Sequence, residues 1–143
     1  MQVLAQSNLF ARAIETVDRP ALAFLRVMAA RNRCLGRSDL FEACAALSID
    51  PAQEAEALAQ ALFSGFSGQG DMPRLRLYQP AADELSFDER WLMSALDAAQ
   101  RGDTDSLTFL LARRVPNHAR RNIAFLLNAL GKCLAQQAVQ QAA

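Results

Sequence analysis

The chain has 143 residues, of which 52% are hydrophobic and 21% are charged. This balance supports a hydrophobic core and excludes a disordered or low-complexity chain. Fifteen Lys and Arg residues offset fifteen Asp and Glu residues, so the formal net charge is zero. A general polyanion-binding protein is expected to be far more basic. With only 6 Gly and 5 Pro, the chain also has few of the turns that a β-sandwich or barrel needs.

The first half of the chain predicts four helices. Apolar residues recur at spacings of three and four in residues 8–18 and 20–35, which is the period of a helix with one buried face. A short helix over 38–47 begins with a serine that can act as its N-cap. An alanine-rich helix over 51–63 has proline at its first position, where proline is well tolerated.

Residues 64–80 interrupt the helical pattern. The only glycine cluster of the chain lies here, at positions 65, 68 and 70, and predicts a loop. Polar and apolar residues then alternate over 73–78, which predicts an extended segment. Because no partner strand is visible in the sequence, an arm lying against helices accounts for this segment at least as well as a strand does.

The second half of the chain carries the clearest start and stop signals. Ser86 and Glu89 match a capping box, and the helix that they begin ends at Gly102. A second helix ends before Pro116, and the last helix begins around Asn117.

Together, these patterns predict an all-α fold, a compact bundle of about seven helices. We expect a single all-helical domain over residues 1–143, with sub-bundles 1–64 and 81–143. The linker 65–80 between them holds the glycine-rich loop and the short extended arm. Two independent domains are the alternative, disfavoured because each half alone would have a small core.

The sequence predicts a cytoplasmic protein. Its three cysteines, Cys34, Cys44 and Cys133, are scattered and form no CxxC pair, which fits a reducing compartment. The N-terminus lacks the basic and apolar regions of a secretory signal. No window reaches the roughly 18 apolar residues of a membrane span, so we expect no membrane partner.

Charge is unevenly distributed along the chain. Residues 1–37 carry a net charge of +4, residues 38–105 carry −9, and residues 106–143 carry +5 with no acidic residue. Two interpretations remain open at this point. The basic ends can neutralise the acidic middle within one molecule, or the molecule can present a basic face that attracts a partner.

The residue types that catalysis and metal binding require are sparse. His118 is the only histidine, and no cysteine lies within four residues of it, so we expect neither a metal site nor a Cys–His catalytic pair. No phosphate-binding glycine motif occurs, and we expect no cofactor. The acidic pair Asp88 and Glu89 falls in the first turn of a helix, where negative charge is favoured without any catalytic role. The protein is therefore not expected to be an enzyme.

A helix-turn-helix pattern fits residues 38–47 and 51–63, with residues 74–78 as a wing. The second helix, which would enter the DNA groove, contains Glu54 and Glu56 but neither lysine nor arginine. Because this charge opposes the phosphates, we interpret the match as a pseudo-motif.

The last helix gives the strongest candidate for a binding surface. At 100° per residue, Phe125 lies opposite a buried stripe that runs from Ile123 to Leu134, on a basic and polar face. Arginines, an aromatic ring and amides suit a protein hot spot or an anion. Alternatively, Phe125 contacts another helix of the bundle. The candidate binding residues are Arg113, Arg114, His118, Arg120, Arg121, Phe125, Asn128 and Lys132. Arg26 and Arg33, which share a stripe on an earlier helix, are expected to form a solvated face.

These observations favour a small cytoplasmic helical protein with a regulatory or adaptor role. It would bind another protein, or a second copy of itself, without catalysis. The expected contact regions are residues 113–132 and the glycine-rich loop with its arm, residues 75–78. The alternative is a nucleic-acid-binding transcriptional regulator that uses the basic terminal segments.

Overall fold

The computed structural model describes residues 18–34 and 51–142, and five helices lie within these ranges. The all-α prediction is confirmed for this part of the chain. The helix count is five rather than about seven, and the other two predicted helices, over 8–18 and 38–47, fall almost entirely outside the described residues. The helices are α2 (Arg19–Cys34), α4 (Pro51–Gly65), α5 (Phe87–Arg101), α6 (Thr104–Arg114) and α7 (Asn117–Ala142).

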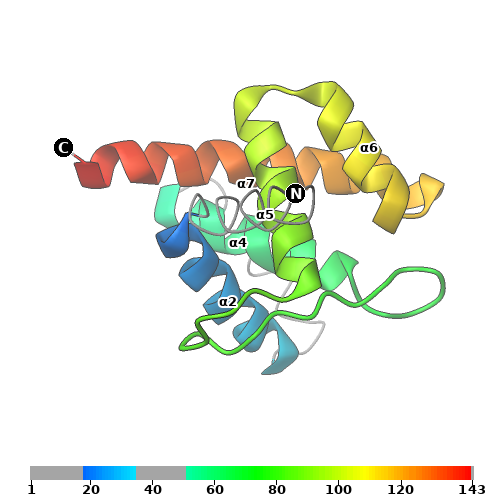
Figure 1. Ribbon diagram of the computed structural model, residues 1–143, viewed down its shortest axis with the longest axis horizontal. Coiled ribbons are helices and arrows are strands. Elements are labelled where there is room, and N and C mark those ends of the chain that lie inside the picture. The colour runs from blue at the N-terminus through cyan, green and yellow to red at the C-terminus, as the bar shows by residue number, and fades with distance from the viewer. Residues whose placement is uncertain (1–17, 35–50, 143) are drawn as a thin grey trace, which may run out of the picture.

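The helices are arranged around α7, which is the longest of them and spans the molecule (Figure 1). Helix α4 packs against α7, α5 crosses it, and α2 and α6 pack on α4 and α5 respectively. One hydrophobic cluster unites α2, α4, α5, α6 and α7. None of the described helices is both long and apolar enough to cross a membrane. The residues at the centre of the core include Leu25, Leu62, Leu92, Leu127 and Leu130.

Local capping signals fix the ends of α5. The backbone N–H of Glu89 donates to Ser86 Oγ at 3.0 Å, and the N–H of Ser86 donates to Glu89 Oε1 at 2.8 Å. Gly102 ends the helix with φ of +70°, a left-handed conformation that glycine adopts at little cost. The capping box and the stop predicted from the sequence are therefore confirmed.

The segment between α4 and α5, residues 66–86, is not part of a sheet. From here on we call this whole segment the arm. Within the described ranges its only β-type pairing is an isolated bridge between Ser67 and Arg74. The arm buries Leu77 and Leu85, and its backbone is held by side chains of α2 and α5. In Figure 1 it runs below α5 and past α2.

Arg26 corrects one expectation about charged residues. It is only 3% exposed rather than part of a solvated face, whereas Arg33 is exposed. Its Nε donates to Glu89 Oε2 at 2.5 Å, and its two terminal nitrogens donate to the carbonyls of Ala82 and Glu84 at 2.6 and 2.7 Å. The arm covers this part of α2, and this long-range contact leaves no signal in the helical period of α2.

Glu89 is the matching buried acid, with no exposed surface. Burial by itself raises the pKa of Glu89. Hydrogen bonds from Arg26 and from the Ser86 N–H outweigh this effect and leave the pKa below its ordinary value. The N–H of Tyr78 also donates to Glu89 Oε2, at 3.3 Å. One ion pair therefore joins α2, α5 and the arm.

Candidate functional site

Three of the eight predicted binding residues, Arg114, His118 and Arg120, form hydrogen bonds or ion pairs within the chain. Arg114 forms an ion pair with Asp88, and its guanidinium lies 5.4 Å from the centre of the Phe87 ring. His118 Nε2 lies 3.0 Å from the carboxylate of Asp71, and the hydrogen bond between them lowers the pKa of Asp71. Asp88 thus compensates one cation of the C-terminal segment, and Asp71 contacts the only histidine.

Arg120 has a structural role at the junction of α6 and α7. Its Nε donates to the carbonyl oxygen of Val115 at 2.8 Å, and Nη2 donates to that of Ala112 at 3.4 Å. These carbonyls lie at the C-terminal end of α6, where no helical N–H follows to bond with them. The guanidinium therefore caps α6.

Four predicted residues form an exposed row on α7, which we call the α7 stripe: Arg121, Phe125, Asn128 and Lys132. At 100° per residue they fall within an arc of about 60° and extend along about 17 Å of the helix. Phe125 is 68% exposed. Neither Arg121 nor Lys132 forms an ion pair with any residue in the described part of the chain.

The opposite side of α7 fixes the orientation of this stripe. The predicted buried residues Ile123, Leu127, Leu130 and Leu134 are all buried, and Leu126 is partly buried. They pack in the cluster shared with α4 and α5, so α7 cannot rotate without exposing its core face. The alternative that Phe125 packs against another helix finds no support among the described helices.

Arg113 lies apart from this row, on the exposed face of α6. Its guanidinium is 5.6 Å from the centre of the Phe109 ring, a cation–π arrangement. Phe109 is itself 60% exposed. Within residues 18–34 and 51–142, Arg113 has no acidic partner.

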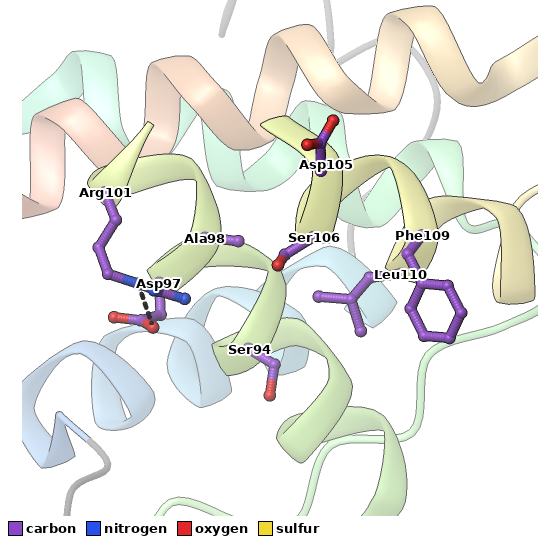
Figure 2. Close-up of a pocket in the computed structure, with 8 residues that line it drawn as sticks. All are labelled: Ser94, Asp97, Ala98, Arg101, Asp105, Ser106, Phe109 and Leu110. Atoms are coloured by element: carbon purple, nitrogen blue, oxygen red, sulfur yellow. Dashed lines mark hydrogen bonds and ion pairs between the residues drawn. The ribbon is translucent and has the colours of Figure 1, made fainter. Parts of the chain in front are cut away.

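A shallow groove of about 510 Å³ lies between α5 and α6 (Figure 2). The ion pair of Asp97 with Arg101, at 2.9 Å, lies on its α5 side, and Phe109 lies on its α6 side. Neither cysteine nor histidine lines it, so it offers no nucleophile paired with an imidazole base. The lining residues are Ser94, Asp97, Ala98, Arg101, Asp105, Ser106, Phe109 and Leu110.

Cys133 is a free, buried cysteine on α7. Burial, with a further contribution from Glu54, raises the pKa of the Cys133 thiol and so disfavours the nucleophilic thiolate. Among the described residues, no three His, Cys, Asp or Glu side chains come together in a group that could hold a metal ion.

The second helix of the pseudo helix-turn-helix is a core helix. In α4, Ala55, Leu58, Leu62 and Phe63 are buried against neighbouring helices. Gln53 and Glu56 are its only exposed residues among those whose side chains are described. Because most of its circumference is covered, α4 has no free face to place in a DNA groove.

Comparison with known proteins adds no relative. No protein-family model, curated protein or solved structure matches this chain.

Proposed function

We propose that the protein is a helical adaptor that binds another protein through the α7 stripe. The observation that carries this proposal is Phe125, an exposed aromatic residue that lies between Arg121 and Lys132 on a face without acidic residues. Aromatic and arginine side chains dominate the binding energy of protein interfaces. The core side of α7 holds the stripe in a fixed orientation, which reduces the conformational cost of binding.

The chemistry of the stripe favours an acidic amphipathic helix as the bound segment. Carboxylates on such a helix can pair with Arg121 and Lys132, and an apolar residue between them can cover Phe125. Asn128 can donate to and accept from polar groups at the rim. Uniformly positive charge also selects against basic partners, because like charges brought together cost energy.

The alternative partner, nucleic acid, is less well supported by this surface. A DNA-binding protein commonly neutralises about 6–10 phosphates. The stripe offers Arg121 and Lys132, and Arg113 lies on a separate helix. Arg114, the remaining basic residue of α6, is already paired with Asp88. We therefore treat nucleic-acid binding as an outcome that the following experiment can detect.

Fluorescence anisotropy with three labelled probes tests the proposal. The probes are a synthetic amphipathic peptide with Leu on one face and Glu on the other, its twin with Lys in place of Glu, and a short DNA duplex. We expect the acidic peptide to bind most tightly. Phe125→Ala and Arg121→Glu should each weaken it about tenfold or more, equivalent to ~1.4 kcal/mol.

Phe109→Ala is the matched control, because Phe109 is an exposed phenylalanine on a different helix. Binding that survives this substitution and is lost with Phe125→Ala supports the α7 stripe. Equal loss with both substitutions contradicts it, as does failure of the acidic peptide to bind. Preferential binding of the duplex, with an affinity that falls steeply as salt increases, would favour the nucleic-acid function instead.

A further inference from the structure

The outward face of α6 carries a symmetric pattern of charge. Asp105, Phe109 and Arg113 are four residues apart, so they follow one another along one side of the helix. All three are exposed. Within the described ranges, neither Asp105 nor Arg113 forms an ion pair. The face therefore has an unpaired acid at one end, an unpaired cation at the other and an aromatic ring between them.

The spacing makes this face complementary to the same face of a second copy that runs in the opposite direction. Asp105 and Arg113 each lie about 6 Å along the helix axis from Phe109, one on either side. If a second copy packs antiparallel, with a two-fold axis passing near Phe109, each Asp105 meets the Arg113 of the other copy. The two phenylalanine rings then meet at the axis. Such a two-fold interface uses the same surface on both copies.

Helix α5, beside α6, also carries an exposed residue of each charge. Arg90 and Asp97 are both exposed and flank Ser94 along α5. Trp91 Nε1 donates to the carbonyl oxygen of Leu110 at 2.9 Å, so the first half of α5 lies beside the C-terminal half of α6. In an antiparallel copy the order of Arg90 and Asp97 is likewise reversed, so α5 also presents opposite charges to the same helix of the second copy. The exposed pairing of Asp97 with Arg101 within one chain is weak enough to be shared.

We infer that two copies of the chain associate through this α5–α6 face, defined by Arg90, Ser94, Asp97, Asp105, Phe109 and Arg113. A second copy is the occupant because Asp105 and Arg113 lie at equal spacing on either side of Phe109, so an antiparallel copy presents the opposite charge at each end. The α7 stripe cannot pair with itself in this way, because it carries cations and no acid. The inference is thus independent of the proposed adaptor function.

Charge exchange tests the two-fold face directly. Sedimentation velocity over a range of concentrations should show a monomer–dimer equilibrium for the unaltered chain. Arg113→Glu leaves only acids at both ends of the α6 pattern, and Asp105→Arg leaves only cations. Each variant alone should dimerise at least about tenfold more weakly, equivalent to ~1.4 kcal/mol.

Combining the two substitutions in two ways makes the test specific. Mixing the Arg113→Glu and Asp105→Arg chains should give a heterodimer, since their faces are then oppositely charged. Combining both substitutions in one chain should restore the homodimer, because the reversed pattern is again self-complementary. Circular dichroism checks that each variant remains helical, and both sites are exposed, so folding is expected to survive.

The outcomes separate this inference from the adaptor proposal. Phe125→Ala should leave the dimer unchanged, whereas Phe109→Ala should weaken it. An unaltered chain that stays monomeric at all concentrations contradicts the inference. So does a dimer that is insensitive to both charge changes, or a double variant that does not recover. None of these results alters the binding of the acidic peptide probe, which reports on the α7 stripe.

Discussion

Two arginines of the molecule lie in opposite environments. Arg26 is buried beneath the arm, where Glu89 and two main-chain carbonyls accept its hydrogen bonds. Arg121 lies on the solvent side of α7 with no acidic partner in the described part of the chain. An arginine that folding has already satisfied has little to offer a partner, whereas an uncompensated one retains its full electrostatic attraction.

The same contrast applies to the uneven charge distribution along the sequence. In the described part of the chain, some basic residues are paired within the molecule and others are exposed, and the attraction of a partner by the exposed ones stays a prediction. Asp88 forms an ion pair with Arg114, and Asp71 forms a hydrogen bond with His118, within the molecule. The α7 stripe keeps its cations exposed.

The largest expected effect comes from breaking the buried ion pair. Arg26→Met leaves the Glu89 carboxylate buried without its partner and should reduce the free energy of unfolding by about 3–5 kcal/mol. Urea denaturation followed by circular dichroism measures the loss. Adding Glu89→Gln to Arg26→Met removes the unpaired charge and keeps an oxygen that can accept from the Ser86 N–H, so the double variant should be more stable than the single one. A double variant whose losses simply add would show that the two side chains are not coupled.

The next comparison concerns two neighbouring positions of α7. Leu127 is fully buried, and Leu127→Ala should cost about 2–5 kcal/mol of unfolding free energy. Phe125→Ala removes a larger side chain from the exposed face and should change stability by no more than about 0.5 kcal/mol. Thermal denaturation of both variants measures the difference. A large loss for Phe125→Ala would mean that its ring packs within the monomer.

Acid should remove the stability that the Glu89 carboxylate contributes to the fold. The pKa of Glu89 is lower in the folded chain than its ordinary value of 4.5, so its stabilising contribution is present above that pH. As the pH falls below about 4.5, the unfolded state takes up protons first and this contribution is lost. Urea unfolding measured between neutral and acidic pH should show a smaller acid dependence in Glu89→Gln than in the unaltered chain. An unchanged dependence would assign the effect to other carboxylates.

The smallest effect concerns the capping box of α5. Ser86→Ala removes the oxygen that accepts from the Glu89 N–H and should reduce the free energy of unfolding by about 1 kcal/mol. Ser94→Ala, at an exposed position within the same helix, is the matched control and should have little effect. The same urea titration measures both. Similar values for the two substitutions would contradict the role of the cap.

The sequence predicted the elements whose signals are local. The Ser86–Glu89 box, the stop at Gly102 and the start of α7 at Asn117 each depend on a few neighbouring residues. The burial of Arg26 could not be predicted in this way, since its partner Glu89 is 63 residues away. The path of the arm decides that contact, and hydrophobic periodicity carries no information about it.

The candidate site shows the same division. The helical period of α7 placed Phe125 on the side opposite its core face, and the structure leaves that side chain exposed. The same period cannot show that Arg114 reaches Asp88 on another helix. The pattern formed by Asp105, Phe109 and Arg113 was detectable in the sequence by its spacing of four, but its significance depends on knowing which face of α6 is buried.

The bridge between Ser67 and Arg74 closes a short loop. This loop should tolerate insertions better than the segment that follows it. Residues 68–70 are exposed and lie at the tip of the loop, so a few additional residues there can extend into solvent. Beyond the bridge, Asp88, Glu89 and Arg26 hold the main chain at successive points. An insertion there would pull those anchors out of register. We expect homologous chains to vary in length within the loop and to keep the length of the segment that follows it constant.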